Sequence, residues 1–309
     1  MYEFDFLSCD GKTNVKAIEW HPDGPPKAIL QISHGFAEHI ARYGGFADFM
    51  ASNGYIVAGH DHLTRGENAT GQDCAGIFNE LGGWETAVCD LRRVTDLIRE
   101  RHRGLHVFLL GHSMGSLLAR TYIIKYRTGL DGVLLSGVGQ LPPLALAACE
   151  TLAKIETSRR GGNCQSKRLN ALVFGGKREK LGLSKTPFDW LTRDDEIISK
   201  YMSDPLCGRM PSIALFADIF SAMKYNSSQK NLKRMKKELP VFFFSGDMDP
   251  FGDYGKGVIS VYRSFLSAGM RDVTMKLYHG GRHEMLNELN REEVYADVLK
   301  WIENKTGRT

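Results

Sequence analysis

The chain has 309 residues, of which 42% are hydrophobic and 25% charged, and its formal net charge is +4. This composition is typical of a soluble globular protein, and the length allows one large domain or a core with an insertion. Such a small net charge argues against a dedicated nucleic-acid-binding protein, which needs a concentrated basic surface. No run of about 18 apolar residues is present, so we expect no membrane-spanning helix.

The N-terminus and the cysteines favour a cytoplasmic protein. Residues 1–6 include two acidic side chains and lack the apolar stretch of a signal peptide. The cysteines are widely scattered and none forms a C-x-x-C pair, which argues against a metal or redox motif. We therefore expect free thiols in a reducing cytoplasm. The six positions are Cys9, Cys74, Cys89, Cys149, Cys164 and Cys207.

Strands and helices alternate through the first part of the chain. Residues 2–8 and 15–20 predict a hairpin around the turn at Asp10-Gly11. Residues 28–33 are apolar without polar alternation, which predicts a strand buried on both faces of a parallel sheet. The next predicted elements are a helix over 43–52, a strand over 55–58, a polar loop over 59–83, a long amphipathic helix over 84–103 and a strand over 132–136.

Residues 105–120 predict a strand, a tight turn and a helix. The turn is Gly111-His112-Ser113-Met114-Gly115, a G-x-S-x-G pattern. Between a strand and a helix this pattern is typical of a nucleophile elbow, which pushes the serine out at the carboxyl end of the strand. The glycines are needed where a Cβ would collide with either element. A glycine-rich turn without chemistry gives the same pattern, so the partners of Ser113 must be found elsewhere.

A long segment separates the strand at 132–136 from the next buried strand, at 241–245. Its roughly one hundred residues are too many for a crossover helix or a structureless loop. We interpret residues 139–237 as a helical cap inserted between two parts of one α/β core, 1–138 and 238–309. Helical patterns occur in the segment at 144–155, 194–202 and 213–224, and beyond it we expect helices at 256–268 and 291–304 and a strand at 273–278.

Carboxylates and histidines follow the last two predicted strands. A serine hydroxyl is a poor nucleophile unless a base lies within hydrogen-bond reach and a carboxylate orients that base. Asp247 and Asp249 follow the first of these strands, and His279 and His283 follow the second. The order Ser, Asp, His is that of α/β-hydrolases, whose sites lie beyond the carboxyl ends of the strands. Spacing alone leaves the choice of aspartate open, whereas the loop containing Gly280 and Gly281 favours His283.

The oxyanion of a tetrahedral intermediate needs hydrogen-bond donors that are already in place. The backbone N–H of Met114, directly after Ser113, is one candidate. The second is the N–H of Phe36, in the loop that follows the strand at 28–33. The sequence therefore predicts an oxyanion hole made by Phe36 and Met114.

Four stretches of the chain form a recognisable set. They are His34-Gly35-Phe36-Ala37-Glu38-His39 with Arg42-Tyr43, Gly111-His112-Ser113-Met114-Gly115-Ser116, Gly246-Asp247-Met248-Asp249-Pro250, and Gly281-Arg282-His283-Glu284-Met285-Leu286-Asn287-Glu288. With them the chain resembles the monoacylglycerol lipase/lysophospholipase branch of the α/β-hydrolases, often labelled serine aminopeptidase S33-like. The resemblance covers both core parts and no motif of the cap. It implies an α/β-hydrolase fold, an eight-stranded mostly parallel sheet flanked by helices with an inserted helical cap.

The resemblance also implies a role for individual residues. Ser113 matches the nucleophile of the family, His283 its base, and Asp249 the acid at the end of a G-x-x-D pattern. Phe36 and Met114 match the oxyanion donors.

Two further features concern the substrate pocket. Glu38 and Arg42 match residues near the polar headgroup in monoacylglycerol lipases, and a structural Arg–Glu pair is an equal alternative. The D-H-R-G-H-G loop usual in the family is replaced by Asp61-His62-Leu63-Thr64-Arg65-Gly66-Glu67. Since that loop holds no member of the triad, the departure concerns the pocket floor rather than catalysis.

We therefore expect a serine hydrolase that cleaves carboxylic esters, monoacylglycerol- or lysophospholipid-like, through an acyl-enzyme intermediate. Its expected partner is a small ester with an acyl chain, with no nucleic acid, no integral membrane segment, no cofactor and no metal. The apolar residues 141–148 either line an acyl pocket or pack as an ordinary helix. The alternative hypotheses are a peptidase, amidase or thioesterase with the same triad, and a catalytically silent binding protein.

Overall fold

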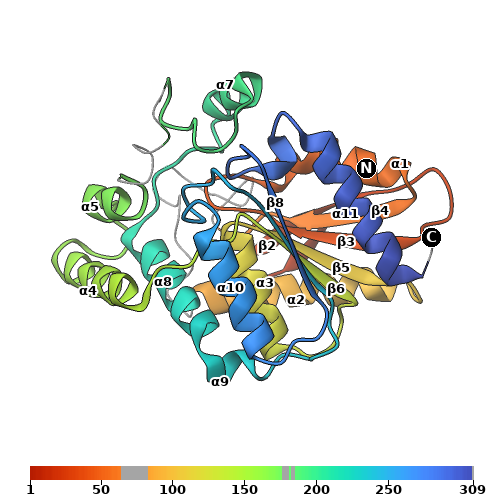
Figure 1. The fold of residues 1–309 in the computed structure, drawn as a ribbon, viewed down its shortest axis with the longest axis horizontal. Coiled ribbons are helices and arrows are strands. Elements are labelled where there is room, and N and C mark those ends of the chain that lie inside the picture. The colour runs from red at the N-terminus through yellow and green to blue at the C-terminus, as the bar shows by residue number, and fades with distance from the viewer. Residues whose placement is uncertain (64–82, 176–180, 182–184, 308–309) are drawn as a thin grey trace.

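The computed structural model describes residues 1–63, 83–175, 181 and 185–307. Its centre is one eight-stranded sheet in the order β1-β2-β4-β3-β5-β6-β7-β8 (Figure 1). β1 and β2 form the expected antiparallel hairpin, β2 pairs antiparallel with β4, and all other pairs are parallel. The strands are β1 (Tyr2–Leu7), β2 (Asn14–Trp20), β3 (Ala28–Ser33), β4 (Tyr55–His60), β5 (Val107–His112), β6 (Gly132–Ser136), β7 (Val241–Gly246) and β8 (Val273–Tyr278).

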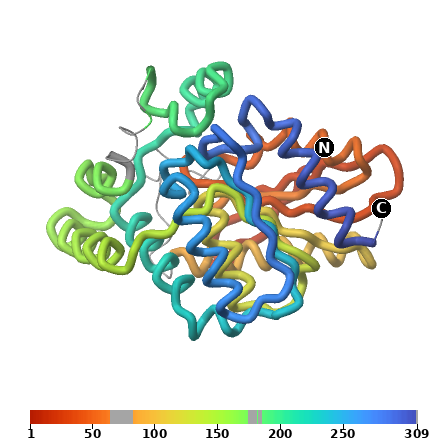
Figure 2. Tube along the Cα trace, in the orientation of Figure 1, coloured from red at the N-terminus to blue at the C-terminus, as the bar shows by residue number. Residues whose placement is uncertain are grey.

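Helices cover both faces of the sheet (Figure 2). Helices α1 (Gly44–Ser52) and α11 (Arg291–Thr306) share one buried apolar cluster with the strands. Helices α2 (Gly83–Arg101), α3 (Met114–Lys125) and α10 (Lys256–Ser267) share the cluster on the other face. This arrangement confirms the predicted α/β-hydrolase fold class. None of the helices in the described part of the chain is both long and apolar enough to span a bilayer.

β7 shows how one strand joins both layers. Successive side chains of a strand point to opposite faces of its sheet. Phe243 packs edge to face on Phe265 of α10, with ring centroids 5.2 Å apart. Its neighbour Phe242 stacks on Trp301 of α11 at 5.8 Å. Burial of each such ring contributes about 1.5–3 kcal/mol, so the unbroken apolar run of β7 stabilises the whole sandwich.

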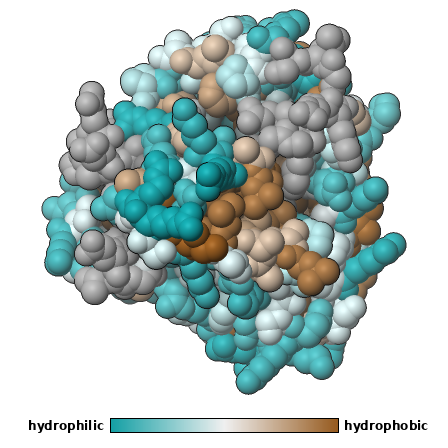
Figure 3. Space-filling model, turned by 90° about the vertical axis from the view of Figure 1, so that its left-hand side faces the viewer, coloured by the Kyte–Doolittle hydropathy of each residue, from teal (hydrophilic) through white to brown (hydrophobic). Residues whose placement is uncertain are grey.

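Further helices lie between β6 and β7, at the left of Figure 1. Those over 143–175 and 213–227 pack around an apolar cluster of their own, which includes Phe216 and Phe220 and reaches Leu117 of α3. Seen from that end, the molecule gathers hydrophobic residues at its centre between hydrophilic ones (Figure 3). The elements are α4 (Pro143–Arg160), α5 (Lys167–Asn170), a π-helical turn η3 (Ala171–Gly175), α7 (Asp195–Ser203), α8 (Ile213–Ser227) and α9 (Gln229–Leu232).

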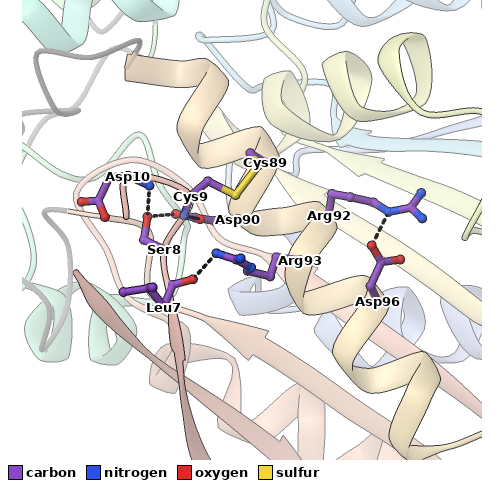
Figure 4. The surroundings of a disulfide bond; sticks show 9 residues. All are labelled: Leu7, Ser8, Cys9, Asp10, Cys89, Asp90, Arg92, Arg93 and Asp96. Atoms are coloured by element: carbon purple, nitrogen blue, oxygen red, sulfur yellow. Dashed lines mark hydrogen bonds and ion pairs between the residues drawn. A yellow bond between two sulfur atoms is a disulfide. The ribbon is translucent and has the colours of Figure 1, made fainter. Parts of the chain in front are cut away.

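A disulfide bond joins Cys9, just after β1, to Cys89 in α2 (Figure 4). The expectation of free thiols is therefore wrong for these two residues. Their spacing of 80 residues gave no signal, and only the packing of the hairpin against α2 brings the Cα atoms to 6.1 Å, within the range for a disulfide. Disulfides persist in oxidising compartments, so the thiols no longer support a cytoplasmic location. Cys149, Cys164 and Cys207 are free, and Cys74 lies outside the described residues.

The same junction is held by Asp90, which follows Cys89 in α2. Its carboxylate accepts hydrogen bonds from the Ser8 hydroxyl at 2.8 Å and from the backbone N–H of Cys9 at 2.6 Å. Burial raises the pKa of Asp90 to about 6, although these two hydrogen bonds oppose that rise. The disulfide and the carboxylate together fix the turn after β1 on α2.

We predict that the double substitution Cys9→Ser and Cys89→Ser lowers the free energy of unfolding by about 2–4 kcal/mol, because the bond restricts the unfolded chain. Urea unfolding under oxidising conditions measures the loss. Cys164→Ser, at an exposed free thiol, is the control and should leave the midpoint unchanged. Equal midpoints for the double variant and the parent chain would contradict the prediction.

Candidate active site

Ser113 stands at the turn between β5 and α3, in a strained conformation with φ 53° and ψ −114°. Both flanking glycines are sterically required. A Cβ at Gly111 would lie 2.5 Å from the carbonyl oxygen of Gly115, and a Cβ at Gly115 would lie 1.9 Å from that of Ser33. Strain of this kind persists where the surrounding elements hold it, and it is concentrated at functional sites. The close approach of α3 to β5 and β3 therefore forces the serine out of the sheet.

The structure separates the two candidate aspartates and the two candidate histidines into pairs. Nδ1 of His283 lies 2.9 Å from Oδ2 of Asp249, and both side chains are buried. Nδ1 of His279 lies 3.0 Å from Oδ2 of Asp247, but the His279 ring is fully exposed. His283 also lines one cavity with Ser113, whereas neither His279 nor Asp247 lines that cavity. Of the two aspartates that spacing left open, Asp249 is therefore the one whose carboxylate is paired with a buried histidine.

Aromatic rings enclose His283. The rings of His112, Trp190 and Phe251 have centroids 4.8, 4.9 and 5.2 Å from its own. Burial alone would lower the pKa of His283, but the carboxylate of Asp249 outweighs it and the pKa is raised above its ordinary value. Burial, followed by the repulsion from His283, lowers the pKa of His112 to about 3. At neutral pH His112 is thus an uncharged neighbour of the pair.

Ser113 and His283 line the same cavity, and Phe36 and Met114 line it with them. Among the described residues no hydrogen bond joins the Ser113 hydroxyl to His283; such contacts are often long before substrate binds. Met114 is the first residue of α3, so its N–H has no acceptor within the helix. The cavity thus brings together a hydroxyl, an imidazole paired with a carboxylate, and the two candidate oxyanion donors.

The loop that carries Phe36 is fastened to the segment around α7. Ala37 has a left-handed conformation with φ 55°, which costs energy for a residue with a Cβ. Its carbonyl oxygen accepts two hydrogen bonds, from the Tyr201 hydroxyl at 2.9 Å and from the backbone N–H of Gly208 at 3.0 Å. These bonds hold the loop in its strained form. Sequence patterns gave no sign of either donor, because both belong to the segment without a family motif.

Glu38 and Arg42 form part of a buried ionic cluster. The Arg42 guanidinium bonds Glu38 at 2.5 Å and Glu284 at 2.7 Å, and it lies 4.7 Å over the ring of Tyr201. Glu38 also accepts the N–H of Gly35 and the hydroxyl of Tyr43. The geometry therefore fits the alternative that Glu38 and Arg42 form a structural ion pair. Glu284 is a second partner of Arg42 that the sequence did not reveal. Glu38 and Glu284 nonetheless line the cavity.

Charge balance in this cluster is set by the single cation. Burial would raise the pKa of Glu284, but Arg42 outweighs it and the pKa falls to about 2. For Glu38, burial prevails over Arg42 and the pKa is raised. The two carboxylates therefore share one guanidinium unequally.

The cavity has a volume of about 330 Å³ and a mainly apolar lining. Most of the apolar side chains come from α3 and α8 and from the segments around 188–191 and 208–211. Of the stretch 141–148, only Leu141 lines this cavity, and Leu146 packs in the cap cluster instead. α8 contributes four apolar side chains to the lining, although the sequence showed only a helical pattern there. Its members there are Phe216, Ile219, Phe220 and Met223.

Two clusters among the described residues carry donor groups that a metal could use, Glu19 with His21 and His102, and His39 with Asp204 and Cys207. Glu19 already binds Arg101 and both imidazoles, and His39 is paired with Asp204 at 2.7 Å. Both clusters are thus explained by their own ion pairs.

The loop after β4, whose sequence differs from the D-H-R-G-H-G pattern of the family, is described only as far as Leu63. Thr64, Arg65, Gly66 and Glu67 lie outside the described residues.

Comparison with known proteins agrees with this geometry. The model of the family described as serine aminopeptidase, S33, matches residues 24–290. The chain is 26% identical to the monoglyceride lipase of Mus musculus over 93% of its own length and 86% of that protein. It is 25% identical to the monoacylglycerol lipase of Mycolicibacterium smegmatis over 97% and 96%. A thermostable carboxyl esterase from Bacillus coagulans, solved with glycerol, has a TM-score of 0.91 at 29% identity and covers 99% of this chain and 98% of its own.

We predict that Arg42→Met lowers the free energy of unfolding at pH 7 by about 3–5 kcal/mol, because it leaves two buried carboxylates without a cation. The loss should shrink as the pH falls towards 4.5, because in the variant, which lacks Arg42, protonation then neutralises Glu38 and Glu284. Denaturant unfolding at several pH values measures both effects. Arg42→Lys keeps the charge and should lose less; a loss independent of pH would contradict the electrostatic explanation.

Proposed function

The chain is a hydrolase that belongs to the serine aminopeptidase S33 family, and we propose that it cleaves single-chain carboxylic esters, such as a monoacylglycerol or a lysophospholipid, through an acyl-enzyme intermediate. The observation that carries the proposal is the strained Ser113 beside the buried Asp249–His283 pair in an apolar cavity. The monoglyceride lipases and the carboxyl esterase among the similar proteins support an ester as the substrate.

In the first half of the proposed reaction, the Ser113 oxygen attacks the carbonyl carbon of the ester. Nε2 of His283 takes the hydroxyl proton, and the carboxylate of Asp249 stabilises the imidazolium that forms. The carbonyl oxygen becomes an oxyanion and accepts the N–H groups of Phe36 and Met114, each worth on the order of 3 kcal/mol. His283 then gives its proton to the leaving alcohol, and the acyl group remains on Ser113.

In the second half, a water molecule loses a proton to His283 and attacks the acyl carbon. The same donors hold the second oxyanion, and its collapse releases the carboxylic acid and restores the Ser113 hydroxyl. The apolar side chains of Phe216, Phe220 and Met223 suit an acyl chain, because burying its methylene groups contributes about 0.8 kcal/mol each. Water is the only co-reactant that this route needs.

Residues 139–237 have the role of a cap in this proposal, and 1–138 with 238–309 form the catalytic core. Trp190 and Leu191 support the arrangement, since their carbonyl groups accept the backbone N–H groups of His283 and Glu284. Tyr201 supports it further through its bond to Ala37. We assign Glu38 and Arg42 to positioning the oxyanion loop, because each of the two side chains also binds other residues of the protein.

A fluorophosphonate should label Ser113, and Ser113→Ala should abolish the labelling and reduce ester hydrolysis by about 10⁴-fold or more. The measurement is a panel of p-nitrophenyl and glyceryl esters of increasing acyl length. Ser199→Ala, on the surface of α7, is the control and should leave the rates unchanged. A parent chain without labelling and turnover would instead be a silent binding protein, and faster cleavage of aminoacyl-naphthylamides would favour the peptidase hypothesis.

The acid limb of the pH profile should report His283. A base must be uncharged, so kcat/KM should fall as the pH drops through a pKa that lies above 6.5. Asp249→Asn removes the carboxylate that raises this pKa, so the limb should move to lower pH while the rate drops by about 10³–10⁴-fold. Asp247→Asn is the matched control and should change neither; if it behaves like Asp249→Asn, the assignment of the acid is wrong.

A further inference from the structure

Arg120 is a fully buried cation that the proposed reaction does not use. It lies on α3, two turns beyond Ser113, and none of its surface is exposed. Within the described part of the chain, its one hydrogen bond runs to the neutral Oε1 of Gln140 at 3.3 Å, and its Nε has no partner. Among the described residues no carboxylate lies within ion-pair distance of it. A buried charge without a counter-ion is costly, so this guanidinium calls for an explanation.

Arg120 lines a groove of about 790 Å³ that is separate from the catalytic cavity. The two share only Gln140 and Leu141 as a common wall. Residues from α3, α4, α8 and α10 surround the groove. These helices lie next to one another in the part of the molecule at the lower left of Figures 1 and 2. We call the groove the Arg120 groove. Its polar lining, apart from the paired Glu150 and Lys224, comprises Arg120, Gln140, Asn226, Ser227, Asp253, Lys256, Ser260 and Ser264.

The start of α4 opens onto the same groove. The helix begins at Pro143 after Pro142, with no capping side chain and no acidic residue in its first turn, and Pro143, Ala145 and Leu146 of that turn line the groove. A helix of 18 residues carries partial positive charge at such an end. Pro143 has no N–H and the N–H of Leu146 binds the carbonyl oxygen of Pro142, so Leu144 and Ala145 have N–H groups without an acceptor in the helix, and Ala145 lines the groove. Two independent positive features, one of them buried, therefore converge on one space.

The other charges in the groove do not neutralise Arg120. Glu150 is paired with Lys224 at 2.9 Å. Asp253 is exposed at the groove, and among the described residues it forms no ion pair with Arg120. Burial lowers the pKa of Arg120 to about 9, so at pH 7 it still carries its charge. An anion beside the guanidinium would reverse that shift and supply the missing partner.

We propose that the Arg120 groove binds a small oxyanion, a carboxylate or a phosphate, through the Arg120 guanidinium and the N-terminal turn of α4. Both anions accept paired hydrogen bonds from the planar guanidinium. The anion arrives free or as the head of a single-chain amphiphile. The rim suits an acyl chain, because Leu172 lines the groove at 52% exposure and Leu144, in the first turn of α4, is 88% exposed.

The test measures the unfolding midpoint of the full chain against rising sodium phosphate, acetate or octanoate, with chloride balancing ionic strength because salt screens such contacts. The concentration dependence of the midpoint gives an apparent Kd. We expect at least one of these anions to stabilise the parent chain beyond chloride. Arg120→Met should weaken that binding at least tenfold, and Lys300→Met, on α11 outside the groove, should leave it unchanged.

Comparing octanoate with acetate and phosphate distinguishes the head of an amphiphile from a free anion. Binding of octanoate at least tenfold tighter than acetate indicates the head of an amphiphile, and binding of phosphate and acetate without such a gain indicates a free anion. Octanoate held in the catalytic cavity instead would survive Arg120→Met, so the proposal does not depend on the proposed esterase activity.

Ser260→Asp is the second variant, in case Arg120→Met does not fold. It places a negative charge in the groove from an exposed position of α10 without touching Arg120, and it should abolish the anion effect. Stabilisation by no anion beyond chloride overturns the proposal. So does stabilisation that is undiminished in Arg120→Met, or in Ser260→Asp if that is the variant which folds.

Discussion

The close approach of α3 to the sheet is the constraint on which the rest of the structure depends. With 1.9 Å between a hypothetical Cβ of Gly115 and the carbonyl oxygen of Ser33, only glycine lets the helix start there. That contact holds Ser113 at φ 53°. Met114, the first residue of α3, and Phe36, in the loop after β3, line one cavity with the serine. The strain is local, and the buried strands on either side, β3 and β6, keep it from relaxing.

Burial then sets the electrostatics around that turn. A dry site makes each ion pair stronger and each unpaired charge more costly. The carboxylate of Asp249 keeps His283 basic in spite of its burial, and Arg42 serves Glu38 and Glu284 together. The segment around α7 contributes to both arrangements, since Tyr201 packs on Arg42 and binds Ala37. Core and insertion are thus joined at the two loops that shape the cavity.

Arg42 and Arg120 show two solutions to the same physical problem. Both guanidinium groups are buried next to the elbow or its helix. Arg42 has two carboxylates and an aromatic ring around it, so its cost is offset within the protein. Arg120 has one neutral amide, and the groove at its side is lined by an uncapped helix end. An exogenous anion would give Arg120 the counter-ion that Glu38 and Glu284 give Arg42.

Sequence by itself determined the class of fold and the set of candidate residues, because buried parallel strands are unbroken apolar runs and an elbow needs glycines at fixed positions. It placed Ser113, His283 and the inserted segment without any contact being known. Tertiary structure alone paired Asp249 rather than Asp247 with the buried His283, and it revealed Glu284, Tyr201 and the Cys9–Cys89 bond. It also left only Leu141 of 141–148 in the apolar lining, to which α8 contributes four side chains. These features depend on residues far apart in the chain, whose spacing carries no period, and on which way a side chain turns once its neighbours are packed.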